Sequence, residues 1–237
     1  MPSETGVWQY SVKEAEDICF SGETCGEFEC VESRNRGPLR LAPEGYHFMY
    51  ENGEREFIVG NTAYNLVATY MRSPQEAKEF IKYYADRRFT WFRFFLEQAT
   101  WDSHGYIVWP FGGTPPQAEL DPQNAESFAV LEGASHGDID LTAYNLDTFR
   151  AAEAVIAELD KHGIVASVIL LHPCDLPFRD VDNIVSVFKA FFRYSVARLG
   201  AYSNVVWNIA NEWERNLVLA AEQVQELGDY LRKIDPY

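Results

Sequence analysis

Residues 164–171 read Ile-Val-Ala-Ser-Val-Ile-Leu-Leu, and His-Pro-Cys-Asp follows at residues 172–175. A stretch that is apolar at nearly every position is typical of a strand buried on both faces of a sheet. A helical pattern over residues 146–162, closed by Gly163, precedes this strand, and another covers residues 181–199 after it. The sequence therefore predicts a buried parallel strand between two helices.

The same alternation of strand and helix extends over most of the chain. Further strands are predicted at 57–60, 89–96 and 205–210, and further helices at 73–87 and 218–234. The helix at 73–87 has the N-cap residue Ser73 and Pro74 at its first position. Alternating apolar strands and helices predict a parallel α/β fold.

Polar residues mark the ends of the predicted strands, namely Asn61, Arg93, His172 and the pair Asn211-Glu212. An open doubly wound sheet would usually carry a glycine-rich turn after its first strand instead. A (β/α)₈ barrel builds its active site from the carboxyl ends of many different strands. The pattern therefore favours a TIM barrel.

The chain divides into two predicted regions. Residues 37–237 hold about four βα units and a closed barrel needs eight, so we expect the N-terminal half of a TIM barrel in a chain that is a fragment. Within this region a hairpin over residues 46–59 is predicted to turn at Asn52-Gly53 with type I′ geometry. Residues 1–36 are β-rich but too short to bury a core, and we expect them to be the remnant of another domain.

Composition narrows the classes of partner. The chain has 237 residues, 47% of them hydrophobic, and a formal net charge of −16, which disfavours nucleic acids and anionic membranes. An acidic surface suits a neutral substrate, although it also simply keeps a protein soluble. No run of 18 apolar residues and no signal-peptide pattern occur, and the sequence decides neither localisation nor oligomeric state.

The four cysteines are Cys19, Cys25, Cys30 and Cys174. The first three are near enough in sequence for one local disulfide, and free thiols are an equal alternative. Their spacing fits no standard zinc pattern, and we predict neither a metal nor a cofactor.

Glu212 is the strongest catalytic candidate because it follows Asn211 at the end of an apolar strand. A partly desolvated carboxylic acid at a barrel mouth can donate a proton near neutral pH. The neighbouring Asn211 can hydrogen-bond a sugar 2-hydroxyl, a contact that strengthens in the transition state. The alternative is an ordinary loop entering a helix, where Asn and Glu are common.

Several other residues are candidates for substrate binding. Arg93 lies in an apolar strand, and a buried Arg needs a carboxylate partner. Either Arg93 forms a structural ion pair, or it keeps the catalytic carboxylate ionised. His172 and Asp175 could orient a substrate; metal binding would need further ligands. The aromatic residues Tyr64, Trp101 and Trp109 are candidate sugar platforms, or core residues.

Several stretches resemble one family. They are Gly37–Leu41 with Tyr46–Gly53, Gly60–Tyr64, Gly163–Asp175, and Tyr194–Tyr202 continuing to Glu212. Together they resemble the apiosidase-like glycoside hydrolases, which belong to the retaining (β/α)₈ clan that also contains cellulases and β-mannanases. The match spans nearly the whole chain, and the stretch ending at Glu212 is its most specific part.

The resemblance implies a role for several residues. Glu212 matches the acid/base of the clan, Asn211 its 2-hydroxyl contact, and Arg93 and His172 its polar strand-end residues. The nucleophile would be a Glu on the seventh strand, beyond this chain. Members often carry an immunoglobulin-like sandwich before the barrel, so the resemblance assigns residues 1–36 to its last strands.

Two positions depart from the family pattern. Cys174 stands where relatives usually have an aromatic residue, and Trp213-Glu214 replaces a more usual Tyr-Asp. The resemblance implies a carbohydrate substrate and a retaining mechanism with two carboxylates. A non-catalytic carbohydrate-binding or inactive barrel fragment remains an alternative, as does a metal-dependent hydrolase built on His172 and Asp175.

Overall fold

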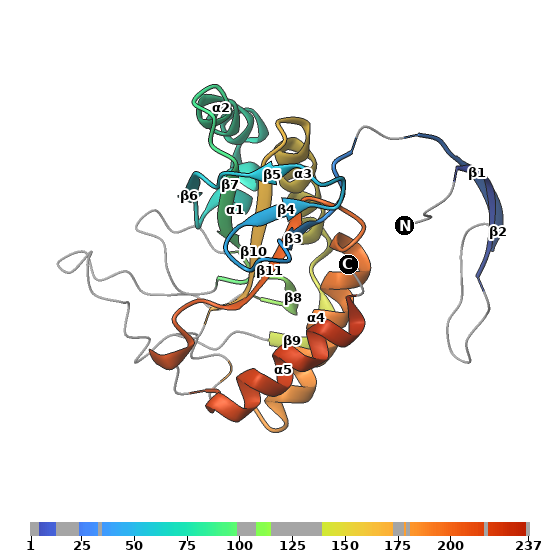
Figure 1. Ribbon diagram of the computed structural model, residues 1–237. Coiled ribbons are helices and arrows are strands. Elements are labelled where there is room, and N and C mark those ends of the chain that lie inside the picture. Colours follow the sequence, from blue (N-terminus) through green and yellow to red (C-terminus); the bar gives the residue numbers. More distant parts are fainter. Residues whose placement is uncertain are drawn as a thin grey trace. The chain divides into compact units, whose positions relative to one another are not determined.

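Figure 1 shows the computed structural model of the chain. It describes residues 5–12, 24–32, 35–98, 108–114, 139–172, 178, 181–215 and 218–235. The chain forms two units, Met1–Arg36 and Gly37–Tyr237. No helix in the described part of the chain is long and apolar enough to cross a membrane.

A four-stranded parallel sheet organises the larger unit. Its strands are β6 (Gly60–Thr62), β7 (Trp91–Phe95), β10 (Val165–Leu171) and β11 (Val205–Ala210). They lie in the order β11-β10-β7-β6, and every neighbouring pair is parallel. The predicted parallel α/β fold is therefore confirmed, with the four strands side by side in chain order.

The first of these strands begins later than predicted, at Gly60 instead of Phe57. Before Gly60 the Thr90 side chain takes part in the pairing: its hydroxyl accepts a hydrogen bond from the Val59 amide (3.0 Å) and donates one to the Phe57 carbonyl (3.2 Å). Residues 57–59 are thus held beside β7 by a side chain in addition to backbone bonds.

The helices follow the strands as expected. They are α1 (Leu66–Arg72), α2 (Pro74–Ala85), α3 (Leu146–Lys161), α4 (Ile184–Leu199) and α5 (Ala221–Ile234). Ser73 caps α2 as predicted, its side chain accepting a hydrogen bond from the Glu76 amide. Gly163 follows α3 with φ +67°. The short helix α1 was not expected.

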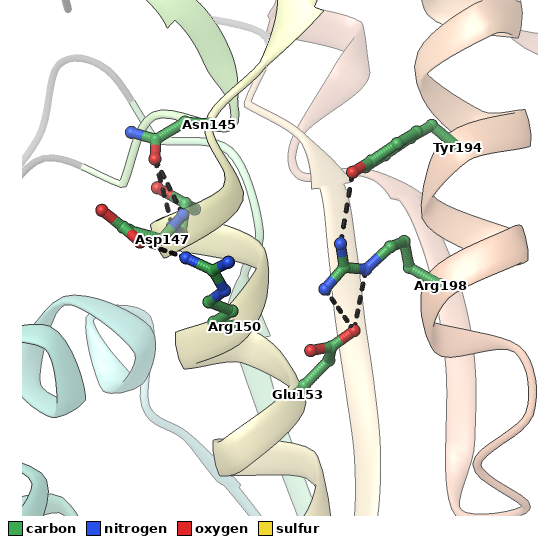
Figure 2. A network of polar contacts seen from close by, with 7 residues as sticks. Asn145, Asp147, Arg150, Glu153, Tyr194 and Arg198 are labelled. Carbon is green, nitrogen blue, oxygen red and sulfur yellow. Dashed lines mark hydrogen bonds and ion pairs between the residues drawn. The ribbon is translucent and has the colours of Figure 1, made fainter. Parts of the chain in front are cut away.

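Polar contacts join α3 to α4, as Figure 2 shows, and aromatic contacts lie beside them. Arg198 of α4 bonds Glu153 of α3 through Nε (2.8 Å) and Nη2 (2.7 Å), and its Nη1 donates to the hydroxyl of Tyr194 (3.3 Å). The Tyr194 ring stacks on Tyr144 with centroids 4.0 Å apart. The ion pair ties α3 to α4, and the ring stacking ties α4 to Tyr144, which precedes α3.

Strand alternation fixes which side chains meet the helices. Phe92 of β7 is fully buried and packs edge-on against Phe80 and Tyr84 of α2. Successive side chains in a strand point to opposite faces. Arg93 therefore projects from the face of the sheet that does not meet α2, which in a barrel is the interior.

A small antiparallel sheet precedes the parallel one. It consists of β3 (Leu39–Leu41), β4 (Phe48–Tyr50) and β5 (Arg55–Glu56). The predicted hairpin is present, but the prediction that its turn is of type I′ is wrong. Type I′ needs positive φ at two central residues, whereas Gly53 has φ +90° and Asn52 has no positive φ. The Tyr50 carbonyl accepts from the Gly53 amide and the Tyr50 amide donates to Glu54, so the loop has three residues.

The long excursion after β7 contains two strands that were not predicted. They are β8 (Phe111–Gly113) and β9 (Ile139–Tyr144), which pair antiparallel. A Cβ added at Gly112 would lie 2.8 Å from that of Ala143. Gly112 therefore allows the close approach of these two strands.

The smaller unit contains an antiparallel ribbon of β1 (Gly6–Ser11) and β2 (Cys25–Cys30). Trp8 lies opposite Phe28. Both ends of β2 carry free thiols, at Cys25 and Cys30, whereas Cys19 and Cys174 lie outside the described residues. The assignment of residues 1–36 to a sandwich domain stays a prediction.

Candidate active site

Arg93 is the centre of a polar cluster at the carboxyl end of the parallel sheet. Its Nη2 donates to Oδ1 of Asn211 (2.8 Å), and its Nη1 donates to the hydroxyl of Tyr64 (3.2 Å). In the amide orientation that satisfies Asn208, the Asn208 oxygen accepts from Arg93 Nε (3.1 Å) and its nitrogen donates to the Ala210 carbonyl (3.0 Å). Three different nitrogens of the guanidinium are thus bound.

The cluster joins three regions that are far apart in sequence. Tyr64 lies after β6, Arg93 is in β7, and Asn208 and Asn211 belong to β11 or its end. Because β7 and β11 are separated by β10, the long side chain of Arg93 crosses over β10 to reach Asn211. A short residue at position 93 could not make this connection.

Asn211 has a defined orientation. It is 6% exposed, and its Oδ1 accepts hydrogen bonds from Arg93 and from the Tyr64 hydroxyl (3.4 Å). Its backbone amide donates to Leu171 (3.1 Å), which continues the ladder between β10 and β11. Because Oδ1 is occupied by two donors, the amide nitrogen is the group of Asn211 suited to donate to a ligand hydroxyl.

His172 joins the cluster through aromatic contacts. It directly follows β10, is 5% exposed and meets Phe95 edge-on, with ring centroids 4.9 Å apart. Phe95 in turn stacks on Tyr64 at 4.7 Å. The ring of Tyr64 therefore packs on Phe95, while its hydroxyl bonds Arg93 and Asn211.

Glu212 follows Asn211 and is exposed to solvent. Its φ of +47° lies in the left-handed region that side chains other than glycine rarely adopt. Such backbone conformations cost about 1–3 kcal/mol and cluster at functional sites. The short 3₁₀ helix Trp213–Arg215 begins immediately after it.

Two polar residues near the site were not singled out from the sequence. Asn208 was predicted only as part of an apolar strand, although a lone polar residue inside such a strand, as at Arg93, was the available signal. Glu97, fully buried, accepts a hydrogen bond at Oε2 from the His172 amide (2.9 Å). A charged residue directly after an apolar strand was the available signal for Glu97.

Other candidates are placed differently. Trp109 is 3% exposed and stacks on Phe178 in the hydrophobic core, so the core alternative describes its place better than a sugar platform does. Asp175 and Trp101 lie outside the described residues. Among the residues that are described, no group of three or more His, Cys, Asp and Glu side chains could hold a metal ion.

A parallel sheet in chain order, covered by helices and carrying a polar cluster at its carboxyl ends, defines part of a TIM barrel. The family model of the apiosidase-like catalytic domain matches residues 42–237. The chain therefore belongs to the apiosidase-like family. No curated protein sequence matches it significantly.

Several solved structures share the fold. A candidate glycoside hydrolase from Bacteroides vulgatus is 24% identical with a TM-score of 0.77, covering 100% of this chain and 44% of that one. An exo-β-1,4-mannosidase from an Opitutaceae bacterium is 13% identical (TM-score 0.57, 83% and 33% covered). A family 5 mannosidase from Rhizomucor miehei is 14% identical (TM-score 0.56, 85% and 54% covered). This chain thus spans about half the length of these proteins or less.

Proposed function

We propose that the protein containing this chain is a retaining glycoside hydrolase in which Glu212 is the acid/base. The observation that carries the proposal is the Asn211-Glu212 pair at the end of β11, with Asn211 held by Arg93 at 2.8 Å. Asn211 would donate to the 2-hydroxyl of a carbohydrate while the adjacent Glu212 protonates the leaving oxygen. Membership of the apiosidase-like family supports a carbohydrate substrate.

The contacts of Arg93 indicate that a second carboxylate, besides Glu212, completes the site. In the described part of the chain its hydrogen-bond partners are the neutral groups of Tyr64, Asn208 and Asn211. A half-buried guanidinium without a carboxylate favours an anion nearby. We propose that this anion is the nucleophile, a Glu on a later barrel strand, and that the 237 residues alone are inactive.

His172 and Asp175 complete the proposal as substrate-binding residues, and Tyr64 as the residue whose hydroxyl orients Asn211. His172 is placed best, since its ring lies against Phe95 beside the cluster. The double displacement would form a covalent glycosyl-enzyme, with the two carboxyl groups about 5–5.5 Å apart. The mechanism uses neither a metal nor an organic cofactor.

The test is the kinetics of Glu212→Gln in the complete protein with two aryl glycosides. With a poor leaving group the rate should fall by about 10²–10⁴-fold, because the proton donor is gone. With an activated leaving group glycosylation should be spared, so the intermediate accumulates and a burst appears. Azide needs no base and should restore turnover with retained configuration.

Glu214→Gln is the matched control, because Glu214 is also exposed and lies two residues away. It should leave both rates within about twofold, as an exposed charge outside the chemistry would. Equal loss on both substrates in Glu212→Gln, without azide rescue, would remove Glu212 from the acid/base role. If the complete wild-type protein binds sugars without cleaving them, the alternative of a carbohydrate-binding protein is correct.

A further inference from the structure

A fully buried carboxylate lies beside the cluster but outside the proposed chemistry. Glu97 is 0% exposed and follows Leu96, also fully buried, at the carboxyl end of β7. Burying a carboxylate is costly unless it is hydrogen-bonded. Glu97 lies at the carboxyl end of the sheet, where the polar cluster is. A buried carboxylate at this place indicates a specific role.

One hydrogen bond of Glu97 takes the place of a rung of the sheet. The backbone ladder between β7 and β10 ends where the Leu96 amide donates to Ile169 (2.9 Å). Beyond that rung, the His172 amide donates to the Glu97 side chain, also at 2.9 Å. On the other side of β10 the backbone ladder continues, from Asn211 to Leu171. A side chain thus holds β10 to β7 at the level of the site.

The residue that is held belongs to the site. His172 carries the imidazole that meets Phe95, and Phe95 stacks on Tyr64, whose hydroxyl bonds Arg93. The bond from Glu97 fixes the backbone of His172, and the edge-on contact with Phe95 fixes its ring. Loss of the first would let the imidazole shift even if the aromatic contact remained.

We propose that Glu97 is a positioning residue, whose carboxylate oxygen acts as the acceptor that holds His172 at the substrate. This proposal rests on the proposed glycosidase function. What matters here is the acceptor oxygen at the right distance. If Glu97 instead transferred protons, its charge and acidity would matter. Variants can separate these two roles of Glu97.

The experiment compares three variants of the complete protein. Glu97→Gln keeps an acceptor oxygen, Glu97→Met removes it at similar size, and Glu97→Asp withdraws it by one carbon–carbon bond. A misplaced group at a reaction centre costs up to about 100-fold. We expect Glu97→Met and Glu97→Asp to lower kcat/KM by about 10- to 100-fold, and Glu97→Gln to stay within about threefold of wild type.

The control is Glu79→Met, which removes an exposed carboxylate from α2 and should leave kcat/KM unchanged. A second measurement needs no substrate: hydrogen exchange of the His172 amide should accelerate at least tenfold in Glu97→Met and little in Glu97→Gln. If Glu97→Met fails to fold, Glu97→Asp provides the same comparison.

The outcomes separate the two proposals. Unchanged activity and unchanged exchange in Glu97→Met and Glu97→Asp would overturn the positioning role. Loss in Glu97→Gln as large as in Glu97→Met would also overturn it, because charge or proton transfer would then matter. If the wild-type protein cleaves no glycoside, the proposed function fails while the exchange measurement still decides whether Glu97 holds His172.

Discussion

At the residue scale, the arrangement around Asn211 explains why a tyrosine is suited to position 64. Its hydroxyl accepts from Arg93 Nη1 and donates to Asn211 Oδ1, and its ring stacks on Phe95. The ring contributes packing and the hydroxyl contributes orientation. A sugar platform, the sequence-based hypothesis for Tyr64, would use the ring face, whereas the contacts here use the hydroxyl.

Tyr64→Phe separates these contributions, because it removes the hydroxyl and keeps the ring. Loss of a hydrogen bond of this kind costs about 0.5–1.5 kcal/mol. We expect kcat/KM of the complete protein to fall by about 2- to 12-fold, mainly in kcat, since Asn211 would contact the transition state less well. Steady-state kinetics on an aryl glycoside provides the measurement.

Tyr83→Phe is the control for this substitution. Tyr83 is 51% exposed on α2, so removal of its hydroxyl should change neither kcat nor KM. A Tyr64→Phe variant with a raised KM and unchanged kcat would indicate that Tyr64 binds substrate directly.

The sequence located part of the candidate site and missed part of it. Arg93 and Asn211 were identifiable because a polar residue inside an apolar strand or directly after it has few other reasons to be there. Their direct bond, however, depends on Arg93 reaching across β10, which no local pattern encodes. The hydrogen bond between Glu97 and the His172 amide, 75 residues away, is likewise encoded by no local pattern.

At the element scale, the predictable parts of the fold were those with strong local signals. The helix after Ser73-Pro74 and the buried strand β10 lie where their patterns predicted. Helix α1 was missed because Asn65 before it makes no side-chain capping bond and Ser73 ends it while capping α2. Strands β8 and β9 pair across 25 intervening residues, from Gly113 to Ile139, and tertiary context decides such pairing.

The contact between α3 and α4 makes a quantitative prediction. Arg198 and Glu153 each have side chains 27% exposed, and the carboxylate is bonded by two guanidinium nitrogens. Removal of one partner from a partly buried pair leaves the charge of the other partner uncompensated. Arg198→Met should therefore destabilise the protein by about 1–2 kcal/mol, after allowance for solvent screening.

The same view of α3 provides the control (Figure 2). Arg150 pairs with Asp147 at 3.0 Å, but these side chains are 66% and 79% exposed. Arg150→Met should cost at most about 0.5 kcal/mol. Thermal unfolding measures both, with Arg198→Met expected to lower Tm by about 2–8 °C. A shift in Arg150→Met as large as in Arg198→Met would mean that burial does not determine the strength of these pairs.

At the scale of the whole molecule, the outer strands of the parallel sheet govern its behaviour in solution. Within the described residues, β6 pairs with β7 alone and β11 pairs with β10 alone. Every residue of β11 is partly exposed, whereas every residue of β10 is buried. An apolar strand with one open edge is a template for pairing with another chain.

Net charge opposes this tendency. The chain carries a formal charge of −16, and repulsion between copies acts over about 10 Å at 0.1 M salt. Edge pairing acts over a strand spacing of about 4.8 Å and is hardly screened. Salt should therefore weaken the repulsion more than the pairing, so association of the 237-residue chain should increase with salt.

We predict that these 237 residues expressed alone form oligomers, and that the oligomers grow between about 0.02 and 0.5 M salt as the screening length shortens. Light scattering coupled to size exclusion measures the mass at each salt concentration. Val206→Lys places a charge in the edge strand β11 and should reduce association, with circular dichroism verifying the fold. Glu214 lies beyond β11, so Glu214→Lys does not block the edge of that strand. It makes the net charge of the chain less negative and should slightly favour association at low salt. A monodisperse monomer at every salt concentration, melting cooperatively, would show that the edges of β6 and β11 are not exposed for pairing.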